Sequence, residues 1–541
     1  MAGPSSPLII IVLPILILVS VLVRHHSRKK LQQPPLLSET VPYVSNAWQF
    51  MTNKRLFINR VREALRESPV VRCRLGPLTL HLVPGGSSVS AIFRSSFTSD
   101  PWILRILEHT AGYTSTDLAK FMADKSGCAT LPRLSSSGPV APYKRIWYAM
   151  HRTHEEGLVS ARSVAAFSAS FQEFLGHQLS EFRTAEWVRV RIFDFLKKHM
   201  SIAATLSVLG SRILDINPGF IEAFWQYEQF AESLSFGLPC LNRQAISSRE
   251  RFCCMCRKWY ELAEQEFDWD IAELPHNPDW EPVFGSRISR GLARWGKSFG
   301  FSVESLGAAY ALLLFGLHAN TIPICTWMTM EVIKDLDLYR AIKEEISRAK
   351  ITDGPLAGSL EPHKLASLPL LQSVYTESLR LHVSILVTRT STQPVTISGY
   401  NIPKGSVFQA PTEVGYLDEA VWSTPDHPAS EFWAYRHVKE VERTDDMGNV
   451  AKGLEFSIGT RSGSYFPFGG GISICAGRNF AKAEVLLAMA MIISEFDVEF
   501  IEWVKLDGSC SDRPALDNGG YADAVAAPPD RDIEIRWRKT F

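Results

Sequence analysis

The sequence predicts one large globular domain that contains long apolar helices and short strands, preceded by a membrane anchor. Apolar residues recur with helical spacing along Phe301–Val332, Leu368–Leu381 and Asn479–Phe496. No Gly/Ser-rich linker, low-complexity tract or internal repeat divides the chain beyond its first forty residues. We therefore expect a single domain over residues 41–541, although length alone suggests about three or four.

The composition is that of an ordinary globular enzyme rather than of a nucleic-acid-binding protein. Hydrophobic residues make up 46% and charged residues 21% of the chain, which suits a packed core. The 57 basic and 57 acidic residues give a formal net charge of zero, so nothing indicates a nucleic-acid partner. Nine cysteines occur, and their one cluster, Cys253-Cys254-x-Cys256, lacks the second pair of a zinc site. Unpaired cysteines suit a reducing compartment.

The N-terminus predicts a single-pass membrane anchor. Pro7–Val23 carries no charge and is followed at once by a basic segment, Arg24–Lys30. At about 1.5 Å per residue the run is near the lower limit for crossing a hydrocarbon core of roughly 30 Å. A cleaved signal peptide has its basic residues before the apolar run; here they follow it and should stay in the cytoplasm. We expect a transmembrane anchor over residues 1–24 and a basic, proline-rich linker over residues 25–40.

The most informative segment is a glycine-rich loop that ends in a cysteine. It reads Phe468-Gly469-Gly470-Gly471-Ile472-Ser473-Ile474-Cys475-Ala476-Gly477-Arg478. Consecutive glycines allow positive φ and a close approach to a flat cofactor. A cysteine just before a helix lies at the positive end of the helix dipole, which favours the thiolate. Such a thiolate can be an axial ligand of haem iron and favours O–O bond cleavage. A buried structural cysteine is the alternative, and the full spacing argues against it.

This loop resembles that of the cytochrome P450 family, the haem-thiolate monooxygenases, whose pattern is Phe-x-x-Gly-x-x-x-Cys-x-Gly. The matching positions are Phe468, Gly471, Cys475 and Gly477. The resemblance implies that Cys475 is the proximal iron ligand and that Phe468 packs beside it. Two positions depart from the usual pattern: Ser473 replaces a basic residue that meets a haem propionate, and Ala476 replaces a proline.

A second segment resembles the family's structural triad. The predicted helix Leu368–Leu381 carries Glu377 and Arg380 on one face, because residues three apart are neighbours on a helix. The run Phe432-Trp433-Ala434-Tyr435-Arg436 follows in a loop before the cysteine. The resemblance implies a buried triad of Glu377, Arg380 and Arg436 behind the haem, with a structural role; Ala434 stands where the family has proline. Such a triad is costly unless every charge is paired.

The apolar helix Phe301–Val332 is expected to bend beside two polar residues. Pro323 cannot donate to the carbonyl of Ala319 four residues earlier, which bends the helix next to Asn320 and Thr321. A freed carbonyl, an amide and a hydroxyl can hold O2 and water there. The alternative is a kinked core helix whose polar side chains only satisfy the backbone.

This helix also resembles the family's oxygen-activating segment, Ala/Gly-Gly-x-Asp/Glu-Thr-Thr. Thr321 matches the first threonine, and Asn320 takes the place of the acid. The local run Ala-Asn-Thr-Ile-Pro, with Trp327 downstream, is similar to the branch that contains the steroid 7α-hydroxylases and prostacyclin synthase. An amide cannot relay a proton as a carboxylate does. We therefore expect Thr321 to deliver protons with bound water, and Asn320 to position that water.

The sequence gives weaker signals for the residues that would contact the haem propionates. The strand-like stretch Thr388–Pro403 contains Arg389, which resembles a family arginine that meets a propionate. Trp147 and Arg152 resemble a Trp-x-x-x-Arg pair, but they are five residues apart and His151 has the expected spacing.

Two surface features complete the sequence pattern. Lys144, Arg145 and Arg152 could form a basic face for an acidic reductase, or an ordinary solvated face. The segment Asp532–Arg538 alternates apolar and charged residues, which predicts a half-buried strand.

The resemblance implies a mainly helical domain with small β-sheets that encloses haem b between the cysteine loop and the Phe301–Val332 helix. It implies NADPH-driven insertion of one atom of O2 into a lipophilic molecule, of the sterol, terpenoid or polyketide type, in biosynthesis. No flavin- or NADPH-binding segment is evident in the sequence, so electrons are expected from a membrane-bound NADPH–cytochrome P450 reductase. We expect a monomer in the endoplasmic reticulum membrane, with its catalytic domain in the cytoplasm.

Two other functions are compatible with parts of this pattern. A haem-thiolate isomerase or dehydratase, which needs neither O2 nor a reductase, is suggested by Asn320 and by the prostacyclin synthase resemblance. A membrane-anchored haem-binding sensor or carrier is the non-enzymatic alternative. The presence of Thr321 beside the helix bend argues against both.

Overall fold

The protein divides into two compact units in its computed structural model, which describes residues 33–133, 140–235, 243–270, 278–354, 358–444, 450–519 and 526–540. Unit 1 comprises the chain up to Thr98 together with Thr388–Ala410, and unit 2 comprises Ser99–Val387 together with Pro411–Phe541. The expected anchor, residues 1–24, and the linker up to residue 32 lie outside the described residues.

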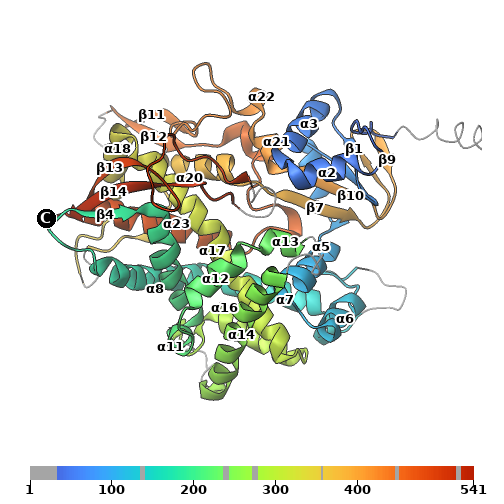
Figure 1. Cartoon of the computed structure of the whole chain (residues 1–541), viewed down its shortest axis with the longest axis horizontal. Coiled ribbons are helices and arrows are strands. Elements are labelled where there is room, and N and C mark those ends of the chain that lie inside the picture. The colour runs from blue at the N-terminus through green and yellow to red at the C-terminus, as the bar shows by residue number, and fades with distance from the viewer. Residues whose placement is uncertain are drawn as a thin grey trace, which may run out of the picture. The chain divides into compact units, whose positions relative to one another are not determined.

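Unit 1 is built around a small β-sheet with strand order β1-β2-β10-β7-β3 (Figure 1). The strands are β1 Val71–Leu75, β2 Leu78–Leu82, β10 Val407–Pro411, β7 Leu386–Ser391 and β3 Phe97–Thr98, and the helices are α2 Ser45–Thr52, α3 Lys54–Glu67 and α4 Ser87–Ile92. The expected strand-like stretch continues beyond β7 as a hairpin of β8 Val395–Ile397 and β9 Tyr400–Ile402. Its turn residues Ser398 and Gly399 both have positive φ, 49° and 84°, as a two-residue type I′ turn requires.

Unit 2 is mainly helical. Its longer helices are α6 Ser115–Ala123, α7 Ile146–Leu158, α8 Ala161–Ser180, α10 Ser201–Leu209, α12 Phe220–Glu228, α14 Arg243–Glu266, α16 Arg287–Ser298, α17 Val303–Ile333, α18 Leu336–Ser347, α20 Pro369–His382 and α23 Arg478–Glu495. Its short helices are α5 Asp100–Arg105, α9 Ile192–Phe195, α11 Arg212–Ile216, α13 Ala231–Ser235, α19 Pro362–Leu365, α21 Thr412–Tyr416 and α22 Glu419–Trp422.

The strands of unit 2 form small sheets at the margins of the helices. Its strands are β4 Val188–Arg191, β5 Trp280–Glu281, β6 Gly285–Ser286, β11 Val438–Thr444, β12 Val450–Phe456, β13 Phe496–Lys505 and β14 Arg531–Lys539. β13, β14 and β4 pair in that order, and β11 pairs with β12 as an antiparallel hairpin. On β14 the side chains of Ile533, Ile535 and Trp537 are buried, which confirms the predicted alternation. The prediction of a mainly helical protein with small sheets is also confirmed.

Helix α17 lies at the centre of unit 2. It begins after Ser302, whose hydroxyl accepts the N–H of Ser305 as an N-cap. It packs against α14, α18, α20 and α23 (Figure 1), and its apolar residues are buried on most sides, as expected of a core helix. It is the one helix in the described part of the chain that is long and apolar enough to cross a membrane, but 72% of its apolar window is buried inside the protein.

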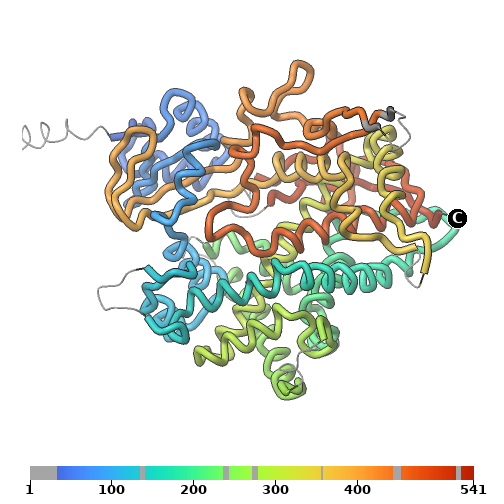
Figure 2. Tube along the Cα trace, turned by 180° about the vertical axis from the view of Figure 1, so that it is seen from behind, coloured from blue at the N-terminus to red at the C-terminus, as the bar shows by residue number. Residues whose placement is uncertain are grey.

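The two other predicted helices, α20 and α23, pack against α17. α20 covers nearly the residues expected, and α23 begins at Arg478, directly after the glycine-rich loop. On the opposite side of the unit, shown in Figure 2, α8 lies against α23. The fold therefore places Glu377 on α20 and the cysteine loop directly before α23, and both of these helices pack against α17, which carries Thr321.

Candidate active site

The glycine-rich loop is a tight turn held by its own backbone. Gly469 and Gly471 have φ values of 70° and 67°, a left-handed region that favours glycine. The N–H of Cys475 donates to the carbonyl of Phe468 at 3.0 Å, which closes the loop. A Cβ added at Gly477 would lie 3.8 Å from the Cys475 sulfur. The backbone on both sides of Cys475 thus holds the thiol at the start of α23.

The thiol of Cys475 is exposed, yet it lies in crowded surroundings. Burial raises its pKa, while the backbone N–H groups of Gly477 and Arg478 and the charge of Arg478 lower it, leaving the pKa above its usual value. The helix terminus acts in the predicted direction, but burial outweighs it. A stable thiolate here requires a further positive charge, such as that of a metal ion bound to the sulfur.

The residues around Cys475 fit a haem. Among the described residues, no group of three or more His, Cys, Asp or Glu side chains could hold a metal ion unaided. Iron already held by a porphyrin needs only axial ligands, and a cysteine thiolate is one of them. Ile472 and Ile474, which lie within the loop just before Cys475, are 41% and 38% exposed. The loop thus presents one sulfur together with apolar side chains, the combination that a flat, largely apolar, iron-bearing group requires.

Serine replaces the basic residue expected at position 473, and its hydroxyl has a partner within the protein. Ser473 Oγ lies 2.8 Å from Ser99 Oγ. This hydrogen bond joins the cysteine loop to the residue that precedes α5. At this position the chain therefore offers a neutral hydroxyl pair rather than a positive charge.

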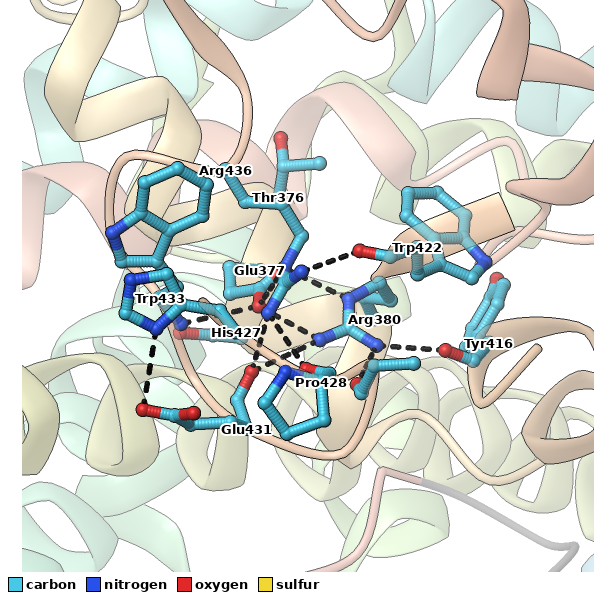
Figure 3. Close-up of polar contacts among 12 residues, drawn as sticks. Thr376, Glu377, Arg380, Tyr416, Trp422, His427, Pro428, Glu431, Trp433 and Arg436 are labelled. Carbon is cyan, nitrogen blue, oxygen red and sulfur yellow. Dashed lines mark hydrogen bonds and ion pairs between the residues drawn. The ribbon is translucent and has the colours of Figure 1, made fainter. Parts of the chain in front are cut away.

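The structure brings Glu377, Arg380 and Arg436 together in a fully buried cluster (Figure 3). Arg380 Nε and Nη2 donate to the two carboxylate oxygens of Glu377 at 2.8 and 2.7 Å, and Arg436 Nε donates at 2.7 Å. His437 Nε2 lies 3.1 Å from the same carboxylate. Burial alone would raise the pKa of Glu377, but Arg380, His437 and Arg436 hold it well below its usual range. The carboxylate is therefore charged.

Backbone carbonyls satisfy the remaining donors of the two guanidinium groups. Arg380 donates to the carbonyl oxygens of Tyr416, Ala429 and Glu431. Arg436 donates to those of Trp422, Pro428 and Glu431. Each charge is thus paired and hydrogen-bonded, which makes burial of such a cluster tolerable. His437 was not predicted as a member of the cluster, although it directly follows Arg436 in the sequence.

Helix α17 has an open side at Gly316. A Cβ built there would meet no atom within 4 Å, whereas the neighbouring His318 is fully buried and its Nε2 lies 3.0 Å from Thr205 Oγ1 on α10. The helix continues through Pro323. Thr321 Oγ1 donates to the carbonyl of Leu317 at 2.5 Å, a common backbone contact of threonine in helices.

Asn320 connects α17 to a C-terminal segment of the chain. Its Oδ1 accepts the backbone N–H of Ala526 at 3.1 Å, and its Nδ2 has only a long contact, 3.5 Å, to the carbonyl of Gly316. About two turns further along, Trp327 Nε1 donates to the carbonyl of Ala527 at 2.8 Å. The side-chain oxygen of Asn320, at the position where the family has an acid, thus already accepts a hydrogen bond within the protein. Sequence spacing gives no signal for a contact between residues this far apart.

The other expected cofactor residues have hydrogen-bond or ion-pair partners within the protein. Arg389 is in β7 of unit 1, where it donates to the carbonyl of Thr388 at 2.9 Å. Trp147 is buried and its indole donates to the carbonyl of Phe121 at 3.0 Å, while Arg152 pairs with Glu155 and Glu156.

One expectation for the basic face was wrong. Arg145, expected on the surface with Lys144 and Arg152, is only 4% exposed and donates to three backbone carbonyls. Its guanidinium satisfies loop carbonyls and is not available to a reductase.

Comparisons with known proteins decide the family. The family model of cytochrome P450 matches residues 293–508. Cytochrome P450 monooxygenase calL of Penicillium decumbens is 38% identical over 516 residues, which cover 94% of this chain and 93% of the relative. The chain belongs to the cytochrome P450 family. It is therefore a haem-dependent monooxygenase, as the resemblance implied.

Two further similarities agree with this result. Cholesterol 7-alpha-monooxygenase of Cricetulus griseus is 24% identical over 530 residues and 94% of each chain, which confirms the expected likeness to steroid 7α-hydroxylases. The solved structure of retinoic acid bound cyanobacterial CYP120A1 aligns with a TM-score of 0.63 at 17% identity, over 94% of this chain and all of that one. The fold is that of the cytochromes P450.

Proposed function

We propose that Cys475 is the axial ligand of haem b in this P450 and that Phe468, Gly471 and Gly477 shape the loop around it. The observation that carries the proposal is an exposed thiol on a glycine-rich turn at the start of α23, flanked by exposed apolar side chains. Arg389 would meet a propionate. When bound, a thiolate-ligated haem supplies O2 activation and cleavage of the O–O bond; the protein residues orient the substrate and move protons.

Thr321 would move the protons. Its hydroxyl already forms a hydrogen bond on α17, five residues after the exposed Gly316. Asn320 would position water with its amide nitrogen, since its oxygen is occupied by Ala526. Glu377, Arg380 and Arg436 would have a structural role, because all three are fully buried and pair with one another.

The substrate would be a lipophilic small molecule such as a sterol, a terpenoid or a polyketide, oxidised in a biosynthetic pathway. Leu317 beside Gly316 on α17 supports apolar contacts, and the relatives include a protein named for cholesterol oxidation. Electrons would come from NADPH through a separate cytochrome P450 reductase. Residues 1–24 would anchor the protein in the endoplasmic reticulum membrane as a single span, with residues 41–541 as one cytoplasmic catalytic domain, acting as a monomer.

The experiment that tests this function compares metabolites of the source organism with and without the gene by mass spectrometry. We expect a precursor to accumulate that lacks one oxygen atom relative to the lost product. A precursor that is isomeric with the product, or that differs from it by water, would contradict oxygen insertion. That outcome would instead support an isomerase or dehydratase, which the neutral Asn320 in place of an acid would suit.

A further inference from the structure

Trp327 on α17 holds a short segment of the chain that comes from near the C-terminus. Its side chain is buried, and its indole N–H donates to the carbonyl of Ala527 at 2.8 Å. The indole also stacks on the ring of His382, with the ring centroids 3.9 Å apart and the ring planes at 1° to each other. This one side chain therefore joins α17 both to the end of α20 and to Ala527.

Ala526 and Ala527 are fixed through their backbone rather than through their side chains. Both residues are buried, but a methyl group buries little apolar area. The N–H of Ala526 donates to Asn320 Oδ1 at 3.1 Å, and the N–H of Ala527 donates to the carbonyl of His382 at 2.8 Å. The position of this segment therefore depends on a few hydrogen bonds, one of which comes from Trp327.

The ring of His382 is itself held by the C-terminal part of the chain. Its Nδ1 lies 2.6 Å from Asp517 Oδ1. Asp517 pairs with Pro529 in an antiparallel bridge, so two stretches of this part of the chain lie side by side and both contact His382. The fixed ring gives the indole of Trp327 a surface to stack on, which keeps its N–H directed at Ala527.

Asn320 and Trp327 lie on the same face of α17. They are seven residues apart, which is nearly two turns and roughly 10 Å along the helix axis. Side chains on a helix lean toward its N-terminus, so the long indole of Trp327 reaches back toward Asn320. Two separate positions on the helix thereby hold the adjacent residues Ala526 and Ala527.

The contact with Ala526 sets the orientation of the Asn320 amide. A backbone N–H can only donate, so the atom of Asn320 that faces it is the side-chain oxygen. The amide nitrogen is then directed to the side of Gly316, where its contact with the carbonyl is long, 3.5 Å. A Cβ built at Gly316 would meet no atom within 4 Å. The amide nitrogen thus keeps its hydrogens available for a water molecule on the open side of α17.

We propose that Trp327 is a positioning residue for oxygen activation, which acts through Ala526 and Ala527 to keep the Asn320 amide in the orientation that binds this water. Without the indole N–H, the segment loses one of its hydrogen bonds and holds the Asn320 oxygen less firmly. The amide then presents its nitrogen to the water less often, and proton delivery through Thr321 slows. O2 that has received two electrons from NADPH takes up two protons and leaves as H2O2 instead of being inserted. The inference rests on the proposed role of Asn320.

The ratio of H2O2 released to oxygenated product formed tests this role. The assay contains purified holoprotein, reductase, NADPH, O2 and a lipid extract of cells that lack the gene. Trp327→Phe keeps a ring that can stack on His382 but removes the N–H, and we expect the ratio to rise roughly fivefold, the size of one net hydrogen bond. The matched control is Trp259→Phe, which removes another buried indole N–H, bonded to the carbonyl of Val283, and should leave the ratio unchanged.

A double-mutant cycle separates this path from a general loss of packing. Asn320→Ala alone should raise the ratio, because the water loses its amide partner. If Trp327 acts through Asn320, adding Trp327→Phe to Asn320→Ala should raise the ratio no further. A tryptophan that only supports the core would add its own effect, so a further rise in the double variant would overturn the proposal.

Hydrogen exchange of the ferric holoprotein examines the segment directly and needs no substrate. Trp327→Phe should speed exchange of the Ala526 and Ala527 amides, whereas Trp259→Phe should not. Equal exchange of these amides in Trp327→Phe and wild type would overturn the proposal. If Trp327→Phe does not bind haem, His382→Asn replaces it, since this variant removes the stacked ring and should raise both the exchange and the ratio. No rise in either quantity would overturn the proposal as well.

Failure of the positioning role can be told apart from failure of the proposed function. If Asn320→Ala raises the ratio and Trp327→Phe does not, only the role of Trp327 is wrong. If Asn320→Ala leaves the ratio unchanged, the proposed role of Asn320 fails, and the role of Trp327 fails with it. If the wild type forms no oxygenated product, the proposed function itself is wrong.

Discussion

Asn320 Oδ1 accepts a hydrogen bond from the backbone N–H of Ala526 at 3.1 Å. This contact joins the oxygen-activating segment of α17 to the segment that precedes β14. A side chain at the usual acid position of the family therefore has a structural partner in this protein. It also explains why an amide suits the position, since a neutral oxygen satisfies the N–H without a buried charge.

Replacing Asn320 should loosen the C-terminal segment. In Asn320→Ala the N–H of Ala526 loses its acceptor, and a net hydrogen-bond contribution of about 1 kcal/mol corresponds to roughly fivefold faster amide exchange. Hydrogen exchange with mass spectrometry measures this. The matched control is Asn320→Asp, which keeps an acceptor oxygen and should protect Ala526. Equal exchange in Asn320→Ala and wild type would show that the bond does not hold the segment.

Removing the Thr321 hydroxyl should uncouple electron use from oxygen insertion. Thr321→Ala loses both the bond to Leu317 and the proposed proton path. We expect more H2O2 to be released per NADPH consumed. We also expect less oxygenated product to form from a lipid extract of cells that lack the gene. Thr321→Ser keeps the hydroxyl and should restore coupling. An isomerase would respond to neither change, so unchanged product in Thr321→Ala would contradict the monooxygenase mechanism at this residue.

Removing one member of the buried triad should strongly lower the free energy of unfolding. Arg436→Ala removes one of the guanidinium groups that hold the Glu377 carboxylate, and loss of one partner of a buried pair costs about 3–5 kcal/mol. Urea unfolding followed by circular dichroism measures the loss. Arg348→Ala is the matched control, because it removes an arginine from the exposed pair with Glu344, and should have little effect. A similarly small loss in both variants would mean that the triad does not support the fold.

Glu484, whose side chain is completely buried on α23, should give the protein a specific pH dependence. Its folded-state pKa is raised by burial, whereas the unfolded value is about 4.3. The proton-bound carboxyl therefore contributes stability that is fully present below the unfolded pKa and is lost as pH rises toward the folded pKa. Glu484→Gln does not titrate, so its thermal midpoint relative to wild type should rise with pH.

Other buried acids do not obscure this comparison. Burial raises the pKa of Asp532 to about 6. Wild type and Glu484→Gln both contain this group, so its effect on the pH dependence of the thermal midpoint cancels when the two midpoints are subtracted. Thermal unfolding of both proteins from acid to neutral pH provides the measurement. A difference that stays constant or shrinks as pH rises would show that Glu484 is ionised in the folded protein.

Much of the fold could be predicted because the relevant signals are local. Helical periodicity located α17, α20 and α23 to within a few residues, and alternation located β14. The cysteine loop and the Glu377–Arg380 pair also depend on spacing within one short segment. Each of these features follows from residues that are close together in the chain.

The rest of the site depends on contacts between distant segments. Nothing near Asn320 in sequence indicates Ala526, and nothing near Trp327 indicates Ala527. Arg145 shows the same limit, because its charge suggested the surface while distant loop carbonyls bury it. Which residues contact one another in the folded core depends on the tertiary structure, and sequence periodicity and motif spacing do not predict it.

The measurement that tests the central claim most directly is the absorption spectrum of the reduced, CO-bound holoprotein. A thiolate ligand moves the main band to the long wavelength that defines the family. We expect that band in the wild type and in Cys254→Ser, which changes another exposed cysteine, and its loss in Cys475→Ser. Retention of the band in Cys475→Ser would contradict the assignment of Cys475 as the axial ligand.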